Sequence, residues 1–322
     1  MSLLKHALML ATTVAVVAPV PAATQVGDAR QGAASVQQQE ADERPLVVNS
    51  DLVTLTVTVT DAEGRHVAGL DKSAFVVTDD KVPQEISFFA DEDAPASVGV
   101  LFDVSGSMSG DKVERAKEAL AGLIRTSHPM DEFFLIDFDS RAELLLNRTR
   151  DGDAVLAKLT YARPHGETAL FDAVYLGVEK VMRGAHRKRA VVVISDGEDN
   201  SSRHTLGELR RQLQESGVTV YAVGIAMNWL PRRRAGEETL KKLAETTGGK
   251  AFFPGGASEL DEAFERIALE LRHQYAVGYR PSNFAADGRW HRVKVRVAPP
   301  PGVNHFHVRA KEGYYAGPSQ RR

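Results

Sequence analysis

One short run of apolar residues, at 98–102, most constrains the fold, because it is typical of a strand buried on both faces. The stretch Asp-Val-Ser-Gly-Ser follows it directly at 103–107, and a helical pattern follows at 112–124. The polar stretch therefore lies in a loop at the carboxyl end of a strand, where open α/β sheets bind ligands. Its carboxylate and hydroxyl oxygens, on alternating residues, suit Mg²⁺ or Mn²⁺ better than zinc.

Buried strands alternate with amphipathic helices from about residue 98 to residue 271. The predicted strands lie at 98–102, 133–138, 142–146, 190–195, 218–225 and 251–253. The predicted helices lie at 112–124, 151–159, 169–183, 205–215, 237–247 and 258–272. This alternation predicts an α/β fold with a Rossmann-like, doubly wound, mostly parallel sheet and helices on both faces. The tight link at 139–141 predicts that 142–146 is an antiparallel edge strand.

Two more polar residues fall at a helix start or a strand end. Thr168 precedes the helix at 169–183, and Asp196 follows the apolar strand at 190–195. In a Rossmann-like strand order the strands that end at Asp103 and Asp196 are neighbours beside the topological switch point. We therefore expect both loops to open into one crevice.

This set of residues resembles the metal-ion-dependent adhesion site of the von Willebrand factor A (vWA) domain, and the flanks are similar to those of bacterial secreted vWA proteins. The matching positions are Asp103, Ser105, Ser107, Thr168 and Asp196. The resemblance implies that the three hydroxyl groups bind Mg²⁺ or Mn²⁺, while the two carboxylates bind it directly or through water and orient the hydroxyls. It also implies that a protein partner completes the metal shell with an acidic residue. The chain would then be a divalent-cation-dependent binding module and not an enzyme.

The N-terminal residues predict a leader that is not part of the fold. Lys5 and His6 precede an apolar run at 7–20, and small residues follow, which is the layout of a signal peptide at 1–23. The polar composition of 24–45 predicts a disordered linker. We therefore expect export to the periplasm or the extracellular space, and a mature chain without a membrane span.

Period-two alternation predicts a β-module on either side of the α/β region. Its predicted parts are 46–94 and 272–316, which flank a vWA domain at 95–271 and precede a tail at 317–322. Within the first part, short strands are expected at 67–70 and 75–78. We expect the two parts to pair into one discontinuous β-sandwich-like module; two separate β appendages are the alternative.

Composition excludes several classes of function. The 322 residues contain no cysteine, which excludes disulfides, thiolate catalysis and zinc–thiolate sites. The net charge of −3 gives no reason to expect nucleic acid as a partner.

Three alternatives to metal-dependent binding stay open at this point. Asp103, Ser105 and Thr168 are residue types that cap helices, so they could act only as caps. The metal could instead stabilise the fold of a structural assembly component. In a metal-assisted phosphohydrolase Asp103 would be the nucleophile, but Ser105 stands where such enzymes carry a second Asp as general acid.

Overall fold

The computed structural model describes residues 52–91, 93–225, 231–282, 286–299 and 305–317. The predicted signal peptide and most of the predicted flanking segments at 24–45 and 317–322 lie outside these residues. Among the described helices, none combines the length and the apolar character that crossing a membrane requires.

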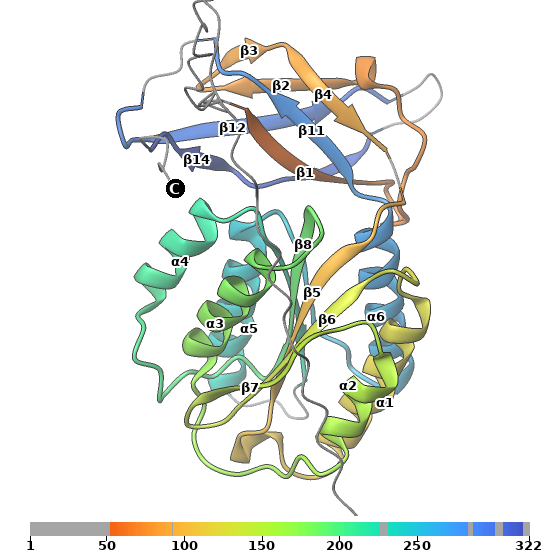
Figure 1. Cartoon of the computed structure of the whole chain (residues 1–322), viewed down its shortest axis with the longest axis vertical. Coiled ribbons are helices and arrows are strands. Elements are labelled where there is room, and N and C mark those ends of the chain that lie inside the picture. The colour runs from red at the N-terminus through yellow and green to blue at the C-terminus, as the bar shows by residue number, and fades with distance from the viewer. Residues whose placement is uncertain (1–51, 92, 226–230, 283–285, 300–304, 318–322) are drawn as a thin grey trace, which may run out of the picture. The chain divides into compact units, whose positions relative to one another are not determined.

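A six-stranded sheet forms the centre of the α/β domain (Figure 1), with strand order β10-β9-β8-β5-β6-β7. The strands are β5 (Ala96–Asp103), β6 (Glu132–Phe138), β7 (Ala142–Thr149), β8 (Lys188–Ser195), β9 (Thr219–Gly224) and β10 (Ala251–Phe252). All pairs are parallel except β6 with β7, at the edge. All eight residues of β5 are buried, as expected for a strand covered on both faces. The predicted doubly wound sheet with an antiparallel edge strand is confirmed.

Helices cover both faces of this sheet (Figure 1). They are α1 (Lys112–Thr126), α2 (Gly152–Leu159) and α6 (Ala257–Arg272) on one face, and α3 (Leu170–Met182), α4 (Leu206–Glu215) and α5 (Pro231–Thr246) on the other. Side chains of β5 alternate between the two cores: Val100 and Phe102 face the first set of helices, and Leu101 faces the second. The sheet therefore lies between two apolar layers, and the polar residues Asp103 and Ser195 stand at the carboxyl ends of its strands.

The segments before and after the α/β domain build two antiparallel sheets. The strands are β1 (Val53–Thr60), β2 (Phe75–Asp79), β3 (Val82–Gln84), β4 (Ile86–Ala90), β11 (Tyr275–Tyr279), β12 (Trp290–Val297), β13 (His307–Arg309) and β14 (Gly313–Tyr315). One sheet has the order β13-β1-β11-β4, the other β14-β12-β2-β3, and a single apolar core includes residues of both.

The α/β domain is inserted between neighbouring strands of this β-module. Ala90 of β4 pairs with Ala276 of β11, although the whole α/β domain separates them along the chain. Both sheets contain strands from both flanks. The prediction of one discontinuous module, in place of two separate appendages, is therefore confirmed.

The predicted strand at 67–70 is wrong. The Tyr275 hydroxyl donates to the carbonyl of Val67 and accepts from the amide of Leu70, so a side chain takes the place of a neighbouring strand. The helix predicted at 237–247 begins earlier, at Pro231, because proline lacks the amide hydrogen that the first helical turn leaves unpaired anyway.

An ion pair links the α/β domain to the β-module. Arg309 Nη2 of β13 lies 2.6 Å from Glu270 Oε1 of α6, and the two side chains are only 23% and 6% exposed. Burial alone would lower the pKa of Arg309, but the charge of Glu270 raises it above its ordinary value. Removing one member of such a pair leaves the other buried and uncompensated.

We predict that Arg309→Met lowers the free energy of unfolding by about 3–5 kcal/mol, because Glu270 then stays buried without its counter-charge. Urea denaturation of Arg309→Met, of Glu270→Leu and of Arg309→Met/Glu270→Leu measures this. The double variant should be more stable than Arg309→Met. If the losses in the free energy of unfolding of the two single variants instead add up in the double variant, Arg309 and Glu270 do not act as a pair.

Candidate metal centre

Asp103, at the end of β5, fixes the loop that follows the strand. It is fully buried, and its Oδ1 accepts a hydrogen bond from the Ser105 amide at 2.8 Å. Its Oδ2 accepts from the Ser195 hydroxyl at 2.5 Å. Both carboxylate oxygens are thus engaged by protein donors, one from its own loop and one from the end of β8.

The hydroxyls of Ser105 and Ser107 form a hydrogen bond with each other, and their oxygens lie 3.0 Å apart. Ser105 occupies the N-cap position of the short turn Gly106–Met108, but its side chain makes no capping hydrogen bond. Neighbouring ligands of an octahedral Mg²⁺, bound at about 2.0–2.1 Å, lie about 2.9 Å apart. The two hydroxyls therefore have the spacing of adjacent magnesium ligands. Because the Ser105 side chain makes no capping hydrogen bond, a capping role does not explain a serine at this position.

The loop that carries Thr168 lies against this turn. The Gly106 amide donates to the Gly166 carbonyl at 3.1 Å, and the His165 amide donates to the Val104 carbonyl at 2.8 Å. Gly166 has a φ of +71°, which a glycine adopts without strain. Thr168 follows two residues later and is 3% exposed.

Asp196 approaches from the neighbouring strand, because β8 pairs with β5 in parallel. Burial is the main cause that raises the pKa of Asp103 to about 6, and the negative charge of the nearby Asp196 adds to it. A cation between the two carboxylates would favour their charged forms. The structure thus brings the five predicted residues to one edge of the sheet, from three loops.

Sequence comparison identifies the domain that carries this arrangement. The family model of the von Willebrand factor type A domain matches residues 97–266. This chain belongs to the vWA family. The described part of the vWA domain also has the mostly parallel sheet with helices on both faces that its sequence predicts.

The relatives extend beyond the part that they share with this chain. A Synechocystis protein, sll0103, is 26% identical over 184 residues, which cover 55% of this chain and 42% of that protein. Mouse inter alpha-trypsin inhibitor heavy chain 4 is 28% identical over 200 residues, covering 57% of this chain and 19% of that protein. This chain thus spans less than half the length of these curated relatives. Among solved structures, a von Willebrand factor type A protein from Catenulispora acidiphila is 16% identical with a TM-score of 0.48, over 83% of this chain and 75% of that chain.

In this vWA domain the loop after β8 is fastened to the start of α3. The Thr168 amide donates to Asn200 Oδ1 at 2.8 Å, and the Thr168 carbonyl accepts from the amides of Asn200 and Ser201. Asp199 Oδ1 accepts from the Phe171 amide at 3.1 Å. The backbone of Thr168 is therefore positioned by the same loop that carries Asp196.

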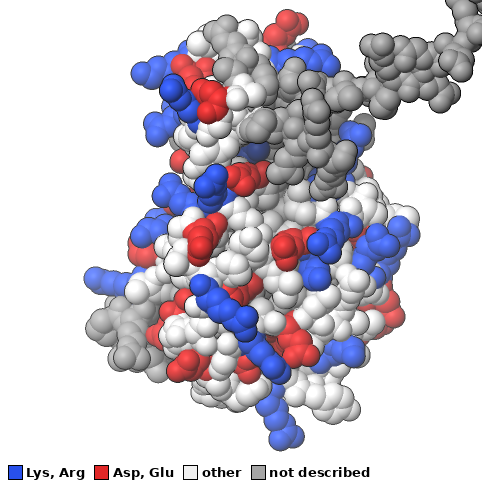
Figure 2. Space-filling model, turned by 60° about the vertical axis from the view of Figure 1, so that its left-hand side comes forward, with Lys and Arg blue, Asp and Glu red and all other residues white. Residues whose placement is uncertain are grey.

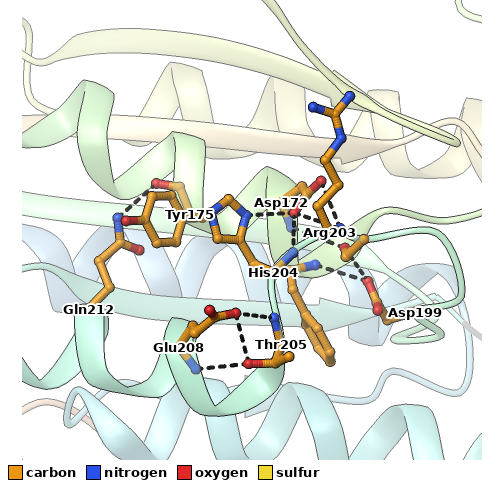
Figure 3. Close-up of polar contacts among 10 residues, drawn as sticks. Asp172, Tyr175, Asp199, Arg203, His204, Thr205, Glu208 and Gln212 are labelled. Carbon is orange, nitrogen blue, oxygen red and sulfur yellow. Dashed lines mark hydrogen bonds and ion pairs between the residues drawn. The ribbon is translucent and has the colours of Figure 1, made fainter.

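A second contact, which the sequence analysis missed, anchors the far end of this loop. Asp172 accepts from the amides of Arg203 and His204, and from His204 Nδ1 at 2.7 Å. Figure 3 shows the imidazole beside this carboxylate and the Tyr175 ring, whose centroid is 3.9 Å away. The capping box of Thr205 and Glu208 then begins α4 (Figure 3). The capping box is readable in the sequence; the contact with Asp172 is not, because it depends on tertiary structure.

Burial raises the pKa of Asp172, but hydrogen bonds from the amides of His204 and Arg203 and from the imidazole outweigh it, so the pKa lies below its ordinary value. A carboxylate with a lowered folded-state pKa contributes stability above its unfolded pKa of about 3.9, and that contribution is lost as the pH falls through the folded value.

We predict that Asp172→Asn lowers the free energy of unfolding at pH 7 by about 1–3 kcal/mol, because the donors from the loop lose a charged acceptor. The difference from the parent should shrink as the pH falls below about 4, because the unfolded parent takes up a proton at this carboxylate before the folded parent does, and it should disappear below the lowered folded-state pKa. Urea denaturation at pH 7 and pH 3 measures both effects. Glu179→Gln, which changes an exposed carboxylate of the same helix, is the control. A gap between parent and Asp172→Asn that is equally large at both pH values would contradict this account.

Proposed function

We propose that this exported chain binds a protein partner through Mg²⁺ or Mn²⁺ held by Ser105, Ser107 and Thr168, with Asp103 and Asp196 beside them. An acidic residue of the partner would complete the metal shell. The observation that carries this proposal is the pair of serine hydroxyls, 3.0 Å apart, in front of a carboxylate whose oxygens are already engaged. When bound there, the cation would supply a positive centre that attracts an outside carboxylate.

The charge of the donor groups supports a binding role. The serine hydroxyls are neutral, and Asp103 directs its oxygens to Ser105 and Ser195. A cation held by such donors keeps much of its charge, and Mg²⁺ commonly retains waters that an incoming ligand can replace.

The burial of Asp103 argues against its action as the nucleophile of a phosphohydrolase. A nucleophile has to reach its substrate, whereas Asp103 is fully buried and hydrogen-bonded through both oxygens. The position two residues later holds Ser105 and not a general acid. These features favour binding over turnover.

The distribution of charge on the face shown in Figure 2 favours recognition through a single local contact. On the face shown in Figure 2, Lys and Arg side chains are interspersed with Asp and Glu side chains, in keeping with the net charge of −3. Interspersed charges of both signs do not produce the extended field that steers a highly charged partner. A single cation that meets a single carboxylate needs no such field.

Export rests on the sequence pattern at 1–23. The short apolar run after Lys5 and His6, followed by small residues, supports delivery to the periplasm or the cell exterior.

We predict that Mg²⁺ binds the chelator-treated chain saturably and that Ser105→Ala/Ser107→Ala abolishes the binding, because two adjacent ligand oxygens are lost. Isothermal titration with Mg²⁺ and with Mn²⁺ measures this. Ser109→Ala is the matched control, since Ser109 is exposed at the end of the same turn. Equal binding by the parent and the double variant would exclude the proposed ligands.

A peptide array separates partner binding from a purely structural role of the metal. The parent should capture peptides that contain Glu or Asp in Mg²⁺ but not in chelator, and should ignore the matched Gln or Asn peptides. Ser105→Ala/Ser107→Ala should capture neither set. A thermal shift with Mg²⁺ but no metal-dependent capture would favour the structural assembly component.

A further inference from the structure

A group of side chains of the types that bind metal ions lies in the β-module, outside the vWA domain. Asp79 ends β2, Asp80 begins the turn to β3, and His291 lies on the adjacent strand β12. One ligand atom from each lies within 4.8 Å of the other two, and no other trio of His, Cys, Asp and Glu in the described parts of the chain does so. This cluster is not readable from the sequence, because β2 and β12 are far apart in the chain.

The backbone of the β2–β3 turn fixes Asp80. Asp80 and Lys81 have φ angles of 45° and 71°, the left-handed pair that joins two strands with the preferred twist. The Asp80 amide donates to the Arg292 carbonyl at 2.9 Å, and the Arg292 amide donates to Asp80 Oδ1 at 2.9 Å. Asp80 Oδ2 then pairs with Nδ1 of His291 at 3.0 Å, a contact that a bound cation would replace.

Asp79 supplies a buried oxygen without a hydrogen-bond partner. The residue is 5% exposed, and its Oδ2 accepts from the hydroxyls of Tyr279 and Tyr314 at 3.0 Å and 2.9 Å. Its Oδ1 has no hydrogen-bond partner and lies 3.8 Å from Nδ1 of His291. A buried carboxylate oxygen without a hydrogen-bond donor is costly, and a bound cation would satisfy it.

Tyr314 and Asp287 lie next to the parts of the His291 ring that do not face Asp79 and Asp80. Its ring stacks on that of Tyr314, with centroids 5.3 Å apart. Its Nε2 faces Asp287 Oδ1 at 3.6 Å, which is longer than a hydrogen bond. Histidines that bind a metal through one ring nitrogen commonly direct the other toward a carboxylate. Asp287 is thus placed to orient the ring while Nδ1 faces Asp79 and Asp80.

We propose that Asp79 Oδ1, Asp80 Oδ2 and His291 Nδ1 form a second divalent-cation site, for an ion of the Zn²⁺ type. Tetrahedral ligands bound at about 2.0–2.2 Å lie about 3.4 Å apart, and the observed separations of 3.0 Å and 3.8 Å from Nδ1 lie on either side of this value. The imidazole nitrogen favours zinc over magnesium. Three protein ligands leave a fourth position for water or for an outside ligand. The ion would join the β2–β3 turn to β12.

Titration of Zn²⁺, with Co²⁺ as a spectroscopic probe, tests this site in the full chain carrying Ser105→Ala/Ser107→Ala. This background silences the site proposed in the vWA domain, so the two proposals fail independently. We expect one equivalent of Zn²⁺ to bind, to raise the melting temperature, and to be replaceable by Co²⁺ with visible absorption bands.

Three further variants assign the ligands. Asp80→Asn removes a ligand charge at a side chain that is 53% exposed, and asparagine tolerates the left-handed backbone, so folding should be retained. It should weaken Zn²⁺ binding more than the roughly 10- to 100-fold typical of losing an outer partner, and Asp287→Asn should lie within that range. Asp71→Asn, an exposed carboxylate of the same module, should bind like the background chain. No saturable Zn²⁺ binding, or binding that Asp80→Asn leaves unchanged, would overturn the proposal.

Discussion

The parallel pairing of β5 with β8 and β6 is the constraint on which the rest of the structure depends. It places the carboxyl ends of buried strands at one edge of the sheet, so the loops that leave them meet there. Asp103 uses this proximity directly, because it receives one hydrogen bond from its own loop and one from Ser195 at the end of β8. The Asp103 carboxylate is buried and fixed by these two hydrogen bonds, and the loop that it holds carries the hydroxyls of Ser105 and Ser107.

Hydrogen bonds between the loop after β8 and the start of α3 also hold this edge of the sheet. Asn200 and Asp199 hold the start of α3, and Asp172 holds the far end of the loop that these residues belong to. Each of these contacts satisfies a backbone amide, which would otherwise be unpaired at a helix start or in a loop. These hydrogen bonds hold the backbone of Thr168 against the loop that carries Asp196.

Much of this arrangement is readable from the sequence, because burial and periodicity are local. The run at 98–102 identifies a central strand, and Asp103, Ser105 and Ser107 follow it at once. The residues that the sequence does not reveal owe their roles to contacts between distant segments. Tyr275 replaces a strand partner for residue 67, and His291 meets Asp79 only because β12 pairs with β2.

Anomalous diffraction from crystals grown with Mn²⁺ tests whether Ser105 and Ser107 bind a metal ion, because it locates the ion without reference to activity. The account predicts a peak within bonding distance of the Ser105 and Ser107 hydroxyl oxygens, close to Thr168. A peak confined to other parts of the chain, with none at these hydroxyls at saturating Mn²⁺, would contradict it.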